Sequence, residues 1–139
     1  MKANQTKPVT PQDERKEFLK KGTLHSSSKA TYRTKDGRSI YQFQYARVGT
    51  YFEIDILSHP SYGNRDAGQH TAHWLSSYRT GGKKICVSQG KEPRTLQAAK
   101  DLSIGWAELT NTYIKTGQTI DDQVRANNRP SGFIEWLFG

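Results

Sequence analysis

Residues 95–117 read TLQAAKDLSIGWAELTNTYIKTG, and the rest of the domain can be built around this stretch. Its apolar side chains recur every three or four positions, which is the period of one helix face. Thr95 can cap the first turn with its hydroxyl oxygen, and Gly117 can end the last turn with a positive φ. We therefore predict a long helix over about Thr95–Thr116, with Trp106 in the middle of its apolar stripe.

A strand pattern lies before this helix, in residues 51–57. Phe52, Ile54 and Ile56 alternate with Tyr51 and two acidic residues, which is the period of a half-buried strand. The apolar set can pack against the stripe of the helix. The predicted fold class is α+β, with a four- to five-stranded antiparallel sheet covered on one face by the long helix.

A hairpin is predicted between the β-prone runs 31–34 and 40–47, because Asp36-Gly37 stands between them. Asp-Gly favours a type I′ turn, in which both central residues have a positive φ. Short β-prone runs at 73–78 and 84–88 can supply the remaining strands.

The aromatic residues of the 40–47 run leave two interpretations open. Tyr41, Phe43 and Tyr45 share one face of that strand. Facing the helix, their rings supply the core that a chain poor in aliphatic residues needs. Facing away from it, the same rings form a platform on which exposed bases can stack.

The flanks differ in composition from this core. We predict four segments: a disordered tail (1–9), a basic N-terminal helix (10–22), an α+β core domain (30–117) and a C-terminal short helix with an aromatic tail (118–139). Thr10-Pro11 starts the first of these helices as a hydroxyl cap followed by proline. Thr119-Ile120-Asp121-Asp122 resembles a capping box that opens the second.

Positive charge is concentrated near the N-terminus. The net charge is +8, and residues 1–50 hold eleven Lys and Arg against four acidic residues. Such asymmetry indicates a polyanionic partner, and nucleic acid bound through phosphate contacts is the leading hypothesis. The candidate contact residues are Arg15, Lys16, Lys20, Lys21, Lys29, Arg33, Lys35, Arg38 and Arg47.

A second hypothesis is a protein-interaction adaptor or inhibitor. The tail holds five large apolar side chains in seven residues, and exposed apolar anchors of this kind dominate peptide recognition. The loop predicted over residues 58–72 is long enough to add contacts. The tail residues are Phe133, Ile134, Trp136, Leu137 and Phe138.

A metal-dependent hydrolase or nuclease is the third hypothesis, because two imidazoles and a carboxylate can hold a divalent ion that activates water. The spacing matches no metal signature, and no other catalytic residue or cofactor is predicted, so a non-enzymatic protein is favoured. The candidate ligands are His59, His70, His73, Asp55 and Asp66.

The composition also indicates the cellular compartment in which the protein works. The single cysteine, Cys86, can form no internal disulfide, and it lies in a short apolar run typical of a buried thiol. No apolar run approaches the roughly 18 residues that span a bilayer. We expect a cytoplasmic protein that does not enter the membrane.

Overall fold

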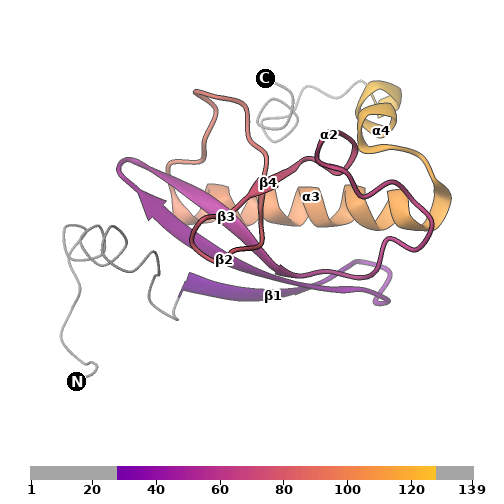
Figure 1. Cartoon of the computed structure of the whole chain (residues 1–139), viewed down its shortest axis with the longest axis horizontal. Coiled ribbons are helices and arrows are strands. Elements are labelled where there is room, and N and C mark those ends of the chain that lie inside the picture. The colour runs from indigo at the N-terminus through magenta and orange to yellow at the C-terminus, as the bar shows by residue number, and fades with distance from the viewer. Residues whose placement is uncertain (1–27, 128–139) are drawn as a thin grey trace.

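The chain folds as an α+β domain in the computed structural model, which describes residues 28–127 (Figure 1). The predicted fold class is confirmed for this part. The predicted tail 1–9, the N-terminal helix 10–22 and the aromatic tail lie outside the described residues. In chain order the elements are β1 (Lys29–Arg33), β2 (Ile40–Val48), β3 (Tyr51–Ser58), α2 (Gln69–Ala72), β4 (Trp74–Ser76), β5 (Lys83–Ile85), α3 (Leu96–Thr116) and α4 (Ile120–Asn127).

The strands form one antiparallel sheet in the order β1-β2-β3-β5-β4. β1 therefore lies at one edge, and the short β4 lies at the other. β4 and β5 are shorter than the predicted runs 73–78 and 84–88. Ser77 already begins a tight turn, in which its N–H donates to the carbonyl of Gly82 at 2.8 Å.

The hairpin between β1 and β2 is confirmed, but its predicted turn type is wrong. Gly37 has a φ of 75°, whereas Asp36 does not have a positive φ. The Thr34 N–H donates to the carbonyl of Ser39 at 2.9 Å and closes a wider loop. The Asp36 carboxylate holds that loop by accepting from the Thr34 hydroxyl (2.7 Å) and the Arg38 N–H (3.0 Å). These side-chain bonds favour the wider loop over a two-residue turn.

The core lies between the sheet and α3, as the apolar stripe predicts. Trp106 is fully buried and meets the rings of Tyr41 and Phe43 edge-on, with centroids 5.8 and 6.2 Å away. Tyr45 is 2% exposed, and its hydroxyl hydrogen-bonds Ser103 Oγ at 2.8 Å. The rings of β2 are therefore core residues, and the stacking platform is excluded.

Both predicted ends of α3 are confirmed. The Thr95 hydroxyl accepts from the Ala98 N–H at 3.0 Å, and Gly117, with a φ of 85°, donates its N–H to the Tyr113 carbonyl. Among the helices of residues 28–127, none is long and apolar enough to cross a membrane.

Residues 58–72 are only partly a loop, because α2 occupies the last four positions. Tyr62 and Ala72 pack with Tyr113 of α3 in a second, smaller cluster. The Ala72 carbonyl also accepts from Trp106 Nε1 at 3.0 Å. These contacts join the segment to the main core and use its apolar side chains internally.

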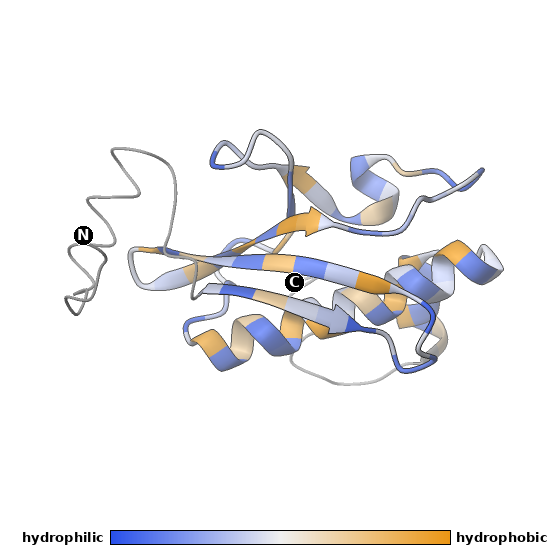
Figure 2. Ribbon diagram, turned by 90° about the horizontal axis from the view of Figure 1, so that it is seen from below, coloured by the Kyte–Doolittle hydropathy of each residue, from blue (hydrophilic) through white to orange (hydrophobic). Residues whose placement is uncertain are grey.

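The opposite face of the sheet carries no covering helix among the described elements. Figure 2 looks toward β1 and β2 with α3 behind them. Along β1 the burial alternates. Ala30 and Tyr32 pack toward the core, whereas Lys29, Thr31 and Arg33 are exposed. The outward face is exposed along β1 and at Ile40 and Gln42 of β2, whereas Gln44 and Asp55 on the same face are buried.

Candidate nucleic-acid interface

Four of the predicted contact residues lie together on β1 and the turn that follows it. Lys29 and Arg33 point outward from β1, and Lys35 and Arg38 stand in the turn. All four are exposed, and none forms an ion pair with an acidic residue in the described part of the chain. We call these four residues the basic edge. Its charges are available to an external anion.

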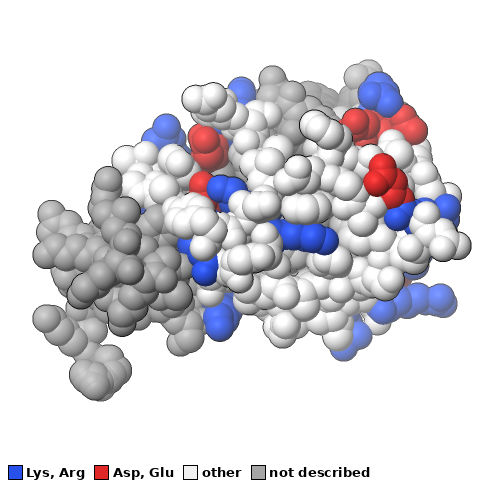
Figure 3. All heavy atoms as spheres, viewed as in Figure 1, with Lys and Arg blue, Asp and Glu red and all other residues white. Residues whose placement is uncertain are grey.

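Figure 3 shows one face of the molecule, with Lys and Arg on several sides of it and Asp and Glu only in its upper part. Lys and Arg side chains lie along the lower border of this view, where β1 and its turn are found in Figure 1. No Asp or Glu side chain appears on that border, whereas acidic groups lie higher up, close to cations. A polyanion approaching from this side meets positive charge first.

The two acidic residues of β3 do not weaken this field, because both are already paired. Asp55 is fully buried and accepts from Arg79 Nε (2.9 Å) and Nη2 (2.8 Å). Glu53 accepts from Arg79 Nη1 at 2.5 Å and pairs with Lys84 at 3.0 Å. The cations that pair with these two carboxylates are thus Arg79 and Lys84.

Burial opposes the charge of Arg79, but hydrogen bonds and charges from Asp55 and Glu53 raise the pKa of its guanidinium above the ordinary value. The cation is thus permanently charged. Ser77 Oγ (2.6 Å) and Gln44 Nε2 (3.1 Å) also bind the Asp55 carboxylate. The outward face of the sheet is close to neutral at β3 and positive toward β1.

The basic edge is held on the body of the domain by α3. Glu108 accepts from the Tyr32 hydroxyl at 2.5 Å and from the Lys35 N–H at 2.9 Å. Burial, followed by this bond to Glu108, raises the pKa of Tyr32 to about 12, so the phenol remains a donor at neutral pH. Asp36 forms an ion pair with Lys115, so the turn itself presents little negative charge.

Of the remaining predicted contact residues, the structure describes only Arg47, which does not lie on this surface. Arg47 shares the face of β2 that points toward α3, and its Cζ lies 5.9 Å above the ring of Phe52. Arg15, Lys16, Lys20 and Lys21 lie outside the described residues. Their contribution stays a prediction.

Comparisons with protein-family descriptions, curated proteins and solved structures found no match for this chain.

The five proposed metal ligands do not form one cluster, and most of them have other partners. Asp55 is bound by Arg79, His73 Nε2 lies 2.6 Å from Asp121 Oδ1, and His70 is exposed on α2. Within residues 28–127, no group of three or more His, Cys, Asp and Glu side chains is placed to hold a metal ion. Asp66 accepts hydrogen bonds from the Gly68 N–H and the Thr71 hydroxyl. His59 is hydrogen-bonded to the Pro60 carbonyl and to Lys83 Nζ. The geometry does not favour a metal-dependent hydrolase.

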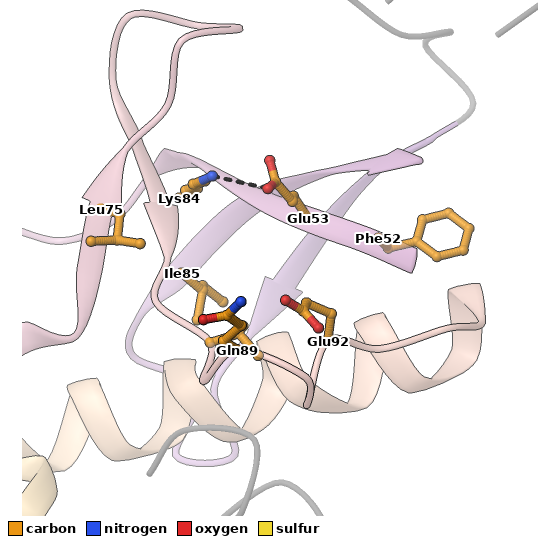
Figure 4. Close-up of a pocket in the computed structure, with 8 residues that line it drawn as sticks. Phe52, Glu53, Leu75, Lys84, Ile85, Gln89 and Glu92 are labelled. Atoms are coloured by element: carbon orange, nitrogen blue, oxygen red, sulfur yellow. Dashed lines mark ion pairs between the residues drawn. The ribbon is translucent and has the colours of Figure 1, made fainter. Parts of the chain in front are cut away.

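A hollow of about 190 Å³ opens between β3 and the segment after β5 (Figure 4). Glu53 and Lys84 point toward each other at one side of it and form an ion pair. Glu92, the other carboxylate in its wall, accepts the Gly90 N–H at 3.0 Å. Since both carboxylates hold neighbouring strands and turns together, we assign the hollow no chemistry.

The Cys86 thiol is half-buried, and burial raises its pKa above the ordinary value while Lys84 acts against that shift. A raised pKa leaves less thiolate at neutral pH, which fits the predicted structural role.

The predicted docking tail, Phe133–Phe138, lies outside the described residues, so the adaptor hypothesis stays a prediction.

Sequence reasoning missed Arg79 and Lys84 as the partners of the β3 carboxylates. It also missed Thr31 and Gln42, which are exposed and lie opposite each other on the outward face of β1 and β2. The period-two pattern of 29–33 was sufficient to place Thr31 beside Lys29 and Arg33 on one face. No local pattern identifies Arg79 as the partner of Asp55, because the two are 24 residues apart and meet only through the strand order.

Proposed function

We propose that this protein binds nucleic acid through the basic edge, and that the contacts are made chiefly to phosphates. The observation that carries the proposal is the combination in Lys29, Arg33, Lys35 and Arg38 of exposure, one shared surface and no acidic partner within residues 28–127. Cations with carboxylate partners must lose those partners before they contact phosphate. These four cations can contact phosphate without first losing a partner.

Energetics also favour the proposal. Each Lys or Arg that neutralises a phosphate releases counterions, so four contacts give an affinity that falls steeply with salt. β1 lies at one edge of the sheet formed by the described residues, and its outward side chains are exposed, so a phosphate can reach them. The turn is fixed to α3 by Glu108 and Asn111, so little ordering of its backbone is required on binding.

The test is a fluorescence anisotropy titration of the full chain with a labelled duplex at 50 and 200 mM salt. The variant Arg33→Gln/Lys35→Gln removes two charges from the basic edge. The variant Arg94→Gln/Lys100→Gln removes one Arg and one Lys elsewhere, and neither of those has a carboxylate partner among the described residues.

We expect the first variant to weaken binding at 50 mM salt and to lower the slope of log K against log salt by about two. The second variant should leave the slope within about half a unit of the wild type. Equal effects of the two variants would show that only total charge matters, and the basic edge would then be the wrong site. Absence of binding by the wild type at 50 mM salt would refute the proposal.

A further inference from the structure

The outward face of β1 and β2 carries more than positive charge. Thr31 and Arg33 on β1 are exposed, and Gln42 lies directly opposite Thr31 on β2. Ile40 lies opposite Arg33 and is 44% exposed. This face therefore combines a guanidinium, an amide, a hydroxyl and an apolar group within two adjacent cross-strand pairs.

The hydrogen-bonding capacity of these groups is largely unused. Gln42 accepts from Ser58 Oγ at 3.1 Å through its carbonyl, and no described group binds its amide nitrogen. Arg33 donates one N–H to the Gly37 carbonyl at 3.0 Å and keeps four others. Gln44 differs, because it is buried and donates to Asp55.

We propose that this face enters the major groove of duplex DNA and that Arg33 and Gln42 contact base edges there. The inference rests on the nucleic-acid binding proposed above and narrows it to one class of nucleic acid and one groove. The basic edge would hold the flanking phosphates.

The dimensions fit. Neighbouring strands are about 4.8 Å apart, and the major groove is about 12 Å wide, so a two-stranded ribbon with its side chains can lie in it. The five residues of β1 extend over about 17 Å, which corresponds to roughly five base pairs. The groove of A-form RNA that carries the distinctive base edges is too narrow and deep for side chains to reach.

Single strands are disfavoured by the placement of the aromatic rings. Binding of unpaired bases depends mainly on stacking against exposed rings. Tyr41, Phe43 and Tyr45 are buried against α3, and Tyr32 packs on the same side. The outward positions of β1 and β2 carry no aromatic side chain, so this ribbon offers no stacking surface.

The side chains match the chemistry of base edges. Arginine makes two parallel hydrogen bonds to guanine, and glutamine makes two to adenine. An apolar group beside them can contact the methyl group of thymine, which gives the exposed Ile40 a role. We therefore expect a preferred site of about five base pairs that contains both G and A.

The experiment is selection from a pool of duplexes with twelve random base pairs, using the full chain, followed by titration of the selected and an unselected duplex. Gln42→Ala is the decisive variant because it changes no charge. Gln97→Ala on α3 is its matched control, since Gln97 is also an exposed amide. Thermal melting confirms that each variant is folded, and Gln42→Ser replaces the alanine variant if that one melts early.

Gln42→Ala should weaken binding to the selected duplex about tenfold and leave the unselected duplex unchanged. Arg33→Ala should weaken both, and the selected duplex more. Gln97→Ala should change neither. Enrichment of a preferred sequence together with these losses supports the inference.

Other outcomes overturn it in distinguishable ways. Tight, salt-dependent binding without any preferred sequence overturns base contact and leaves the proposed function standing. Stronger binding to duplex RNA or to a single strand of equal length overturns the choice of duplex DNA and also leaves the proposed function standing. If no nucleic acid binds at 50 mM salt, the proposed function and this inference both fail.

Discussion

The guanidinium of Arg79 donates to both carboxylate oxygens of Asp55, at 2.9 and 2.8 Å, and neither side chain is exposed to solvent. Arg79 stands in the turn between β4 and β5, and Asp55 stands in β3. The pair therefore fastens that hairpin to the sheet. It also removes a negative charge from the face on which the basic edge lies.

Replacing Arg79 by methionine should destabilise the domain by about 3 to 5 kcal/mol, because Asp55 would keep a buried charge without its partner. Urea unfolding followed by Trp fluorescence measures the change. Lys84→Met is the matched control: it removes a cation from the more exposed pair with Glu53 and should cost about 1 kcal/mol or less. A loss below 1 kcal/mol for Arg79→Met would contradict the role given to this pair.

Gly117→Ala should cost more stability than Gly90→Ala. The two glycines have nearly the same φ, 85° and 86°, so both substitutions bring similar backbone strain. Only at Gly117 would a Cβ meet another group, Arg65 Nη1 at 2.9 Å. Arg65 donates to the carbonyls of Ile114 and Lys115, so displacing it uncovers the end of α3.

We expect about 1 kcal/mol for Gly90→Ala and about 2 kcal/mol for Gly117→Ala, measured by urea unfolding. Addition of Arg65→Ala to both should remove most of the difference. Equal losses for the two single variants would mean that the contact with Arg65 does not stabilise the helix end.

Stability should fall between pH 10 and pH 12, in part through Tyr62. Burial, and then the neighbouring Tyr113, raise the pKa of Tyr62 from 10.0 to about 12. Between these values the phenol ionises in the unfolded chain before it does so in the folded domain. Its contribution is therefore complete below pH 10 and is lost as the pH rises through 12.

For a group 7% exposed, this shift corresponds to about 2 to 3 kcal/mol. Tyr62→Phe should flatten the alkaline fall by roughly that amount, as measured by urea unfolding at pH 8, 10 and 11.5. Leu57→Ala, at an exposed position, serves as a control that removes no titrating group. An unchanged pH dependence in Tyr62→Phe would mean that its phenol titrates alike in both states.

The sequence predicts those parts of the fold that depend on neighbours along the chain. The stripe around Trp106 and the caps at Thr95 and Gly117 are local patterns, and the structure confirms them. β3 is also confirmed as a strand with Ile54 and Ile56 in the core, but it is not half-buried, because Asp55 on its other face is buried as well. The face of the β2 rings was ambiguous because strand periodicity does not say which side is covered. Burial of Tyr41 and Phe43 against α3 resolves it.

The candidate site could be predicted only in part, because local patterns along the chain do not show which distant residues meet. The positions of Lys29 and Arg33 follow from the period of one strand. Their isolation from acidic groups depends on Arg79 and Lys84, which reach Glu53 and Asp55 through a strand order that local patterns do not encode. Arg47 belongs to the same positive region of sequence but lies on the other face of the sheet, apart from the basic edge.

Asn111 should act on nucleic-acid binding through the position of the β1–β2 turn and not through charge. Its amide donates to Asp36 Oδ2 at 3.1 Å, and its carbonyl accepts from the Ser39 hydroxyl at 2.8 Å. Both partners lie in the turn that carries Lys35 and Arg38. Asn111→Ala removes these two bonds between the turn and α3 and leaves those made by Glu108 and Lys115, so it loosens the turn without removing a cation.

We expect Asn111→Ala to weaken binding to a duplex about threefold, because ordering of the turn must then accompany binding. The slope of log K against log salt should stay unchanged, since the number of phosphate contacts is the same. Thr112→Ala, at the next position of α3, is the neutral control. A lower slope in Asn111→Ala would mean that phosphate contacts are lost outright, and an unchanged affinity would mean that the turn needs no anchoring.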